Sequence, residues 1–193
     1  MGKIVVLAGS PRKNGNTDRL VEAFAEGAEK NNKVDVIPVS DHNVKLCTGC
    51  NSCFEREGNN CFQHDDMTEI YEKLKAADTL IIASPVYFYG ISAQLKAVID
   101  RFHTPMRNKF HIKKLGLILV GAAELPELFD AVITQYRLIL NFFKLKDAGM
   151  VLVRGAKEKG DVRSEDLVKA FKLGKSIGTF PIGDLSVPLS RSL

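Results

Sequence analysis

Five apolar runs alternate with five amphipathic stretches along the chain, and this alternation restricts the fold more than any other feature. The runs predict strands at residues 4–8, 33–39, 78–84, 114–123 and 150–153. The stretches between and after them predict helices at residues 16–28, 66–77, 95–102, 125–143 and 164–177. Strands that alternate with helices in this way indicate an α/β domain built on a parallel sheet.

The expected architecture is a three-layer, doubly wound, five-stranded parallel sheet with the flavodoxin-like strand order 2-1-3-4-5. In this arrangement ligands bind beyond the carboxyl ends of strands 1 and 3, where the strand order reverses. We expect a single domain over residues 1–180, followed by a polar C-terminal tail at 181–193. Asp66 and Glu69 predict a capping box at the start of the second helix.

Composition excludes several classes of function. The net charge is only +4 and the lysines are scattered, which gives no basis for binding nucleic acid. No apolar run approaches the roughly 18 residues that a membrane span requires, so we expect no membrane association. The chain enters a strand at once, without the pattern of a signal peptide, and we therefore expect a cytoplasmic protein.

The loop GSPRKNGNT at 9–17, directly after the first strand, predicts an anion site. We expect Asn16 to cap the helix that follows. The free N–H groups and the dipole of a helix N-terminus favour a phosphate, and polar side chains of the loop can complete its shell. These side chains are Ser10, Arg12, Asn14, Asn16 and Thr17. An ordinary turn remains the alternative, because Gly, Ser and Asn are common in turns.

The loop SPVYFYGIS at 84–92 follows the third strand and should lie beside the first loop. Its aromatic residues Tyr87, Phe88 and Tyr89 offer flat surfaces and backbone N–H groups. A flavin needs both a cover for its ring and donors near its polar edge. The alternative is that these side chains pack the loop onto its own domain.

All four cysteines lie in a long predicted loop at 40–64, with the spacing Cys47-x2-Cys50-x2-Cys53-x7-Cys61. A disulfide framework would spread cysteines through the chain, and disulfides are rare in the cytosol. The run is similar to the C-x2-C-x2-C pattern of [4Fe–4S] sites, whereas a zinc site usually has a second C-x2-C knuckle. We expect a [4Fe–4S] cluster, while zinc and merely reduced thiols stay open.

Three segments together resemble the NAD(P)H-dependent FMN reductase family, and within it the iron–sulfur flavoproteins. They are the loop at 9–17, the cysteine run followed by Asp65-Asp66-Met67, and SPVYFYGISAQLKAVIDR at 84–101. The resemblance extends over residues 3–155. It implies a flavodoxin-like fold, noncovalently bound FMN, and oligomers built from dimers, as a homodimer or a homotetramer.

The resemblance also implies roles for individual residues. The polar residues named for the first loop would hold the FMN phosphate. The residues along the isoalloxazine would be Pro85, Val86, Tyr87, Phe88 and Gly90, and the cluster ligands would be Cys47, Cys50, Cys53 and Cys61. Relatives often carry small hydroxylated residues or glycine after the fourth strand. This chain has Gly121-Ala122-Ala123-Glu124 there, so any flavin contact would come from the backbone.

The expected function is that of an FMN-dependent oxidoreductase that passes electrons between a reduced donor and an acceptor. NAD(P)H is a candidate donor and a ferredoxin-like protein a candidate partner. The cofactor would carry the chemistry, so we assign no catalytic side chain, and we expect His64 and His103 to be surface or capping residues. Two other classes stay open: an NAD(P)H:FMN or quinone reductase without a cluster, and a zinc-binding interaction module.

The helix at 125–143 carries more apolar residues than one buried stripe requires. Leu128, Leu138, Ile139 and Phe142 add a second apolar side. Because an exposed apolar patch marks an interaction surface, we expect the chain to self-associate through this helix.

Overall fold

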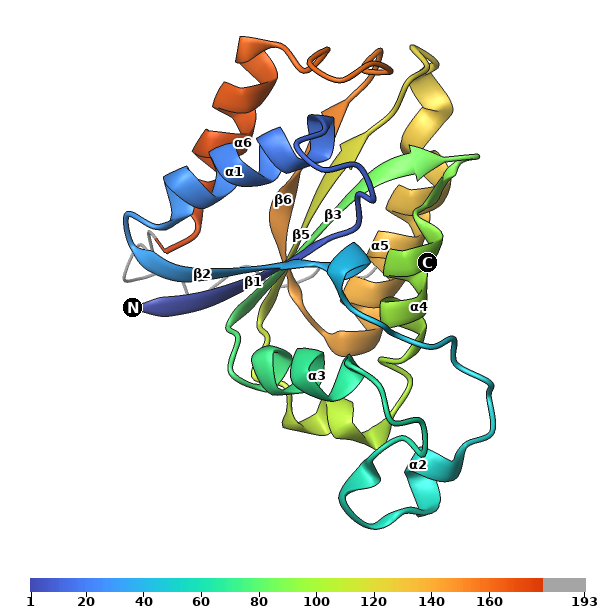
Figure 1. The fold of residues 1–193 in the computed structure, drawn as a ribbon. Coiled ribbons are helices and arrows are strands. Elements are labelled where there is room, and N and C mark those ends of the chain that lie inside the picture. The colour runs from blue at the N-terminus through green and yellow to red at the C-terminus, as the bar shows by residue number, and fades with distance from the viewer. Residues whose placement is uncertain (179–193) are drawn as a thin grey trace, which may run out of the picture.

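The structure is a computed structural model that describes residues 1–178. The expected tail at 181–193 and the last two residues of the expected domain lie outside the described residues. Figure 1 shows a twisted sheet between two layers of helices, with α1 and α6 on one face and α3, α4 and α5 on the other. Within the described part of the chain, no helix combines the length and the apolar character needed to cross a membrane.

The sheet has the expected topology. Its strands are β1 (Gly2–Ala8), β2 (Asn32–Pro38), β3 (Thr79–Tyr87), β4 (Gly90–Ile91), β5 (Lys114–Val120) and β6 (Lys146–Val153). The long strands are parallel and follow the order β2-β1-β3-β5-β6. This is the order 2-1-3-4-5 of the five predicted strands, and the numbering differs because the short β4, which was not predicted, pairs antiparallel with the end of β3.

The helices cover the sheet in two layers. They are α1 (Asn16–Ala28), α2 (Ser52–Glu55), α3 (Met67–Lys75), α4 (Ala93–Asp100), α5 (Asp130–Phe143) and α6 (Ser164–Ser176). Four short 3-10 turns complete the described elements: η1 (Val39–Asp41), η2 (Glu57–Asn59), η3 (Pro105–Lys109) and η4 (Pro126–Phe129).

Each central strand is apolar on both faces because both faces are covered. In β3, Leu80 and Ile82 belong to the core under α3, α4 and α5, while Ile81 and Ala83 belong to the core under α1 and α6. Successive side chains of a strand point to opposite faces, so a continuous apolar run fills both cores.

Helices α1 and α6 pack closely because each has a glycine at the crossing. A Cβ built on Gly27 would lie 2.1 Å from the carbonyl oxygen of Phe171, and one on Gly174 would lie 2.0 Å from that of Phe24. Only a residue without a side chain fits at these two positions. The close crossing therefore fixes the last turns of α1 against α6.

The segment that carries the cysteines projects from the domain beyond α3 and α4 (Figure 1). Its two ends are joined where they leave the domain. The Asn43 N–H donates to the Asp66 carboxylate at 2.7 Å, and the Lys45 N–H donates to the Asp65 carboxylate at 2.9 Å. We call this junction of residues 43–45 with 65–66 the neck. The predicted capping box is wrong, because Asp66 occupies the N-cap position but its side chain binds Asn43 and makes no capping bond.

Candidate functional site

The first candidate site is a crevice of about 150 Å³ at the carboxyl ends of β1 and β3, which we call the anion crevice. The two strands meet here, because Ala8 pairs with Ala83 and the Gly9 N–H donates to the Ala83 carbonyl at 2.8 Å. The residues that line it are Ser10, Arg12, Gly15, Asn16, Thr17, Pro85, Val86, Tyr87, Val120, Ala122, Ala156, Lys157 and Lys159. Seven of the predicted binding residues are therefore brought together, whereas Asn14, Phe88 and Gly90 do not line the crevice.

The N-terminus of α1 opens into this crevice, and the only hydrogen bond to a side chain there within the described chain is to the Asp18 carboxylate, which accepts from the Gly15 N–H at 3.3 Å. Gly15 is the N-cap residue and supplies no side-chain acceptor, so the expectation that Asn16 caps the helix is wrong. Thr17 is buried, and its hydroxyl makes no hydrogen bond to any residue of 1–178. First-turn N–H groups have no acceptor within their own helix, and the helix dipole places partial positive charge beside them. The crevice therefore offers unused donors to an anion.

Asn16 fixes a second loop against the first. Its side-chain amide donates to the Ala156 and Glu158 carbonyls at 3.2 and 2.8 Å, and its oxygen accepts from the Gly160 N–H at 3.0 Å. Arg12 adds a bond from its guanidinium to the Lys157 carbonyl at 3.3 Å. The side chain of Asn16 thus holds the β6–α6 loop in place beside the helix N-terminus.

The β6–α6 loop contributes two cations that sequence reasoning missed. Lys157 and Lys159 line the crevice together with Arg12, and no acidic residue is among its described lining residues. Both lysines follow β6, the fifth predicted strand, in the short stretch GAKEKG. Because parallel strands end at the same edge of the sheet, this position was a signal that the two lysines reach the crevice. Lys157 also lies 3.8 Å from the Glu158 carboxylate, while the three cations together still favour an anion in the crevice.

The second predicted loop is a strained hairpin. Tyr87 pairs with Gly90, and the turn between them consists of Phe88 at φ 46° and Tyr89 at φ 65°. Two-residue turns of this kind normally contain Asn and Gly, and aromatic residues rarely adopt a positive φ. Phe88 is 98% exposed, so it does not pack the loop onto the domain. Strained backbone and an exposed ring together indicate a surface that contacts another molecule.

The second candidate site is a small pocket in the projecting segment, which we call the cysteine pocket. Cys47, Cys50, Cys53 and Cys61 all line it, and all four are free thiols. The chain turns sharply between them, with Gly49, Asn51, Gly58 and Asn59 at positive φ. Among residues 1–178, no three His, Cys, Asp or Glu side chains are close enough to hold a single metal ion. A lone tetrahedral zinc requires sulfur atoms about 3.8 Å apart, and this arrangement is not preformed.

The local hydrogen bonds favour the thiolate form of Cys50. The hydrogen bond with the Ser52 hydroxyl, at 3.2 Å, is the main cause that lowers the pKa of the exposed Cys50 thiol to about 7. The Arg101 guanidinium lines the same pocket and is 3% exposed. Thiolates are the form that binds metals, and a neighbouring cation stabilises them.

Arg101 also ties the neck to the domain. It forms an ion pair with Asp65 at 2.8 Å and donates to the Lys45 carbonyl at 3.0 Å. Burial favours the neutral form of Asp65, but the hydrogen bonds from Arg101 and the Lys45 amide outweigh it and hold the pKa of Asp65 below its usual value. Both partners of this pair lie in the family-like segments that sequence analysis singled out, but nothing in their spacing indicated that they pair.

His64 and His103 are both exposed, as expected. His103 lines the cysteine pocket and its ring lies 5.4 Å from that of Phe54, which the sequence did not indicate.

Comparison with known proteins identifies the family. Residues 2–156 match the family model described as NADPH-dependent FMN reductase. An iron–sulfur flavoprotein of Methanocaldococcus jannaschii is 36% identical over 192 residues, covering 91% of this chain and 95% of its own. An iron–sulfur flavoprotein of Archaeoglobus fulgidus is 32% identical over 179 residues, covering 91% of this chain and 78% of its own.

A solved structure with a similar fold is an NAD(P)H:quinone oxidoreductase from Methanothermobacter marburgensis. It superposes with a TM-score of 0.73 at 19% identity, and the match covers 90% of this chain and 96% of that one. At this level of identity the likeness supports the fold.

Proposed function

The chain belongs to the NADPH-dependent FMN reductase family and is an oxidoreductase, and from this premise we propose that it is an iron–sulfur flavoprotein. In this proposal FMN binds noncovalently at the anion crevice, and a [4Fe–4S] cluster binds in the cysteine pocket. NAD(P)H is the proposed donor and a ferredoxin-like protein the proposed acceptor. The observation that carries the flavin site is the N-terminus of α1, whose N-cap residue Gly15 supplies no side-chain acceptor and which opens into a crevice lined by three cations.

The FMN phosphate is assigned to the inner part of the crevice. Ser10, Arg12 and Thr17 would bind it with the first-turn N–H groups of α1, and Lys157 and Lys159 would add charge from the opposite loop. Asn16 acts as a positioning residue, since its amide is occupied by the β6–α6 loop. Asn14 is exposed and lies outside the lining, so the proposal gives it no direct contact.

The flavin ring is assigned to the outer part of the crevice. Pro85, Val86 and Tyr87 line this part, and the hairpin places Phe88 and Gly90 beyond them as an outer cover. The end of β5, which is the fourth predicted strand, contributes Val120 and Ala122, neither of which carries a hydroxyl. A bound flavin would supply the conversion between two-electron and one-electron transfer, and the residues of this chain would bind its ring and shield it from water.

The cysteine pocket suits a cluster better than a single ion. Four thiols face one pocket, and their separation is too wide for one metal ion within the described chain. A cluster binds each thiolate through a different iron atom and therefore accommodates wider spacing. The names of the two relatives described above support this assignment.

The flavin assignment is tested by comparing the affinities of FMN and riboflavin. Arg12→Ala should weaken FMN binding by about tenfold or more and leave riboflavin nearly unchanged, because a hydrogen-bonded charge contributes about 1.5–3 kcal/mol. Lys13→Ala is the matched control, since Lys13 lies in the same loop but pairs with Asp41 and does not line the crevice. Equal losses for both ligands in Arg12→Ala would place the phosphate elsewhere.

The cluster assignment is tested on protein prepared without oxygen. About four irons per chain are expected. Cys50→Ala should abolish the iron and spare the flavin, because the two lining sets share no residue. Zinc bound in stoichiometric amount would favour the zinc-binding interaction module instead. Protein that is fully loaded with flavin but holds neither iron nor zinc would favour a reductase without a cluster.

We also propose that the chain forms a homo-oligomer through α5. Leu138 and Phe142 are 64% and 62% exposed on its outer side. The predicted second apolar side is smaller than expected, because Leu128 is buried in η4 and Ile139 is half-buried. Leu138→Glu should shift the protein to monomers in light scattering, and a wild-type chain that is already monomeric at micromolar concentration would contradict the proposal.

A further inference from the structure

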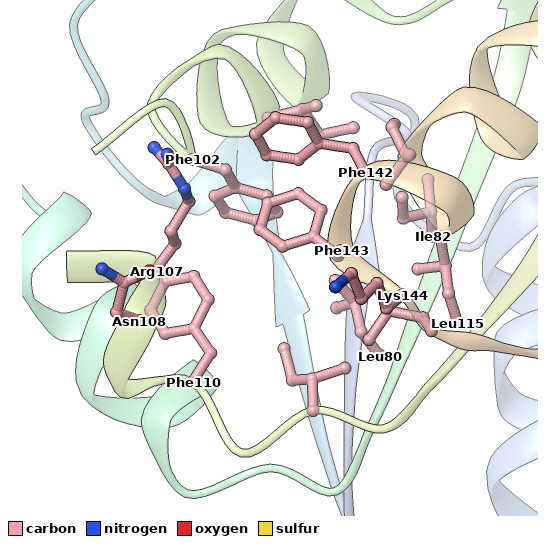
Figure 2. Close-up of a pocket in the computed structure, with 14 residues that line it drawn as sticks. Leu80, Ile82, Phe102, Arg107, Asn108, Phe110, Leu115, Phe142, Phe143 and Lys144 are labelled. Carbon is pink, nitrogen blue, oxygen red and sulfur yellow. The ribbon is translucent and has the colours of Figure 1, made fainter. Parts of the chain in front are cut away.

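A third pocket lies outside both candidate sites. It has a volume of about 390 Å³ and lies between β3, β5, η3 and the ends of α4 and α5 (Figure 2). Of its fourteen lining residues, all except Arg107, Asn108 and Lys144 are apolar. None of the fourteen lines the anion crevice or the cysteine pocket. We call it the α5 pocket.

The α5 pocket is at the opposite end of the sheet from the proposed flavin. Leu80 and Leu115, which form its wall, pair with each other near the starts of β3 and β5. Pro85 of the crevice is five residues further along β3, or about 16 Å at the usual rise of a strand. A molecule in this pocket would therefore not compete with FMN.

The rings around the cavity contact one another and leave its centre open. Phe102 and Phe110 meet edge to face at 6.0 Å, and Phe142 and Phe143 do so at 5.0 Å. In Figure 2, Phe110 and the wall formed by Leu80 and Leu115 stand on opposite sides of the space. The space opens to solvent beside the exposed Phe142, and a concave, mostly apolar pocket of this size is typical of a ligand site.

The polar side chains of the pocket are two cations, Arg107 and Lys144, and the amide of Asn108, which can donate through its NH2 group. The guanidinium of Arg107 lies 5.3 Å from the Phe142 ring and donates to the Thr104 carbonyl. The side chains of Asn108 and Lys144 make no hydrogen bond or ion pair with any residue of 1–178, and no carboxylate is among the described lining residues. A lysine at a helix C-terminus also stabilises the helix dipole, but this role does not explain why Arg107 and Asn108 lie at the same pocket.

We propose that the α5 pocket binds a small carboxylate with an apolar body. The aromatic and aliphatic lining would bury the body, and Lys144, Arg107 and Asn108 would bind the carboxylate. At about 30 Å³ for each non-hydrogen atom, the cavity holds on the order of a dozen such atoms. Decanoate has this size and chemistry and serves as the probe.

The experiment is calorimetric titration of the FMN-loaded protein with decanoate, decan-1-ol and decylamine. Decanoate should bind with one-to-one stoichiometry and at least about tenfold more tightly than the alcohol, because it adds charge-assisted hydrogen bonds. Decylamine should bind more weakly than either. Equal affinities for decanoate and decan-1-ol would overturn the assignment of the carboxylate.

Variants locate the binding in this pocket. Lys144→Asn keeps a residue that tolerates the left-handed backbone at φ 54° and should weaken decanoate about tenfold while sparing decan-1-ol. Lys109→Asn is the matched control, because Lys109 is exposed on η3 and does not line the pocket. Ile112→Trp and, independently, Leu145→Trp should fill the cavity and abolish binding of both probes, with flavin absorbance reporting an intact fold.

Two further results would overturn the proposal. The first is decanoate binding that survives in both tryptophan variants. The second is a wild-type dimer that binds no decanoate while its Leu138→Glu monomer does, because a second copy would then be the natural occupant of this surface.

Discussion

Replacing Arg101 by methionine should be among the most damaging single changes outside the apolar cores. The substitution keeps much of the side-chain volume and removes the charge that pairs with Asp65. The Asp65 side chain has no exposed surface, so its carboxylate would remain buried with only the backbone N–H groups of Lys45 and Met67 as donors. Removing one partner of a buried ion pair costs about 3–5 kcal/mol.

This loss is a large part of the total free energy of unfolding, which for a domain is about 5–15 kcal/mol. Urea unfolding followed by circular dichroism would measure it as a lower midpoint with an unchanged slope. Lys96→Met is the matched control, because Lys96 of α4 pairs with Asp100 at the surface, where both side chains are more than 40% exposed. An exposed pair of this kind contributes about 0–1 kcal/mol.

The pH dependence distinguishes a charge effect from lost packing. In the wild-type protein the pKa of Asp65 is lowered by its partners, so the ion pair contributes fully above the unfolded pKa of about 3.9 and is lost as pH falls through the folded pKa. In Arg101→Met, burial without the cation should raise the pKa of Asp65, and acid should relieve the unpaired charge. The difference in stability between the two proteins should therefore be greatest near pH 7 and shrink towards pH 4.

Two results would refute this reasoning. One is a loss below about 1 kcal/mol at pH 7, which would show that the pair contributes no more than an exposed one. The other is a loss that does not change between pH 7 and pH 4, which would assign the effect to packing. The double variant Arg101→Met/Asp65→Leu should recover part of the loss, because no unpaired buried charge remains.

Three further predictions follow from the two candidate sites. Asn16→Ala should weaken FMN more than riboflavin and lower stability by about 1–3 kcal/mol, measured by flavin titration and urea unfolding, because the β6–α6 loop loses its bridge. The double change Phe88→Asn with Tyr89→Gly should relieve the positive-φ strain and raise the free energy of unfolding, measured in urea, by about 1 kcal/mol or more. The same change should lower the affinity for FMN. In metal-free protein, alkylation of Cys50 should rise with pH through about 7, and Ser52→Ala should move that rise to higher pH because it removes the main cause of the lowered pKa.

The sheet and the crevice could be predicted because their signals are local. A continuous apolar run such as Ile4–Ala8 suits a strand covered on both faces, and the alternation of strands with helices favours one strand order. The loops at 9–17 and 84–92 therefore fell at one edge, and seven of the ten predicted cofactor residues line one crevice.

The remaining features depend on pairings between distant residues. Asn16 and Gly160 are 144 residues apart, and Arg101 and Asp65 are 36 apart, so no periodicity in one sequence indicates either contact. Asn16 is a good N-cap residue by type, but its side chain forms three hydrogen bonds to the β6–α6 loop. Gly15 therefore occupies the N-cap position instead. The hairpin at Phe88 was missed because its turn residues contradict the usual preference.

The neck makes the cysteine segment a separable unit. Because residues 43–45 and 65–66 are hydrogen-bonded side by side, the segment enters and leaves the domain at one point, and no strand runs through it. A chain in which residues 46–64 are replaced by a short turn should keep its sheet and its flavin crevice. Conversely, the same segment could be transplanted onto another α/β scaffold if an aspartate and an arginine equivalent to Asp65 and Arg101 close its neck. A metal centre would then be gained or lost without redesigning the core.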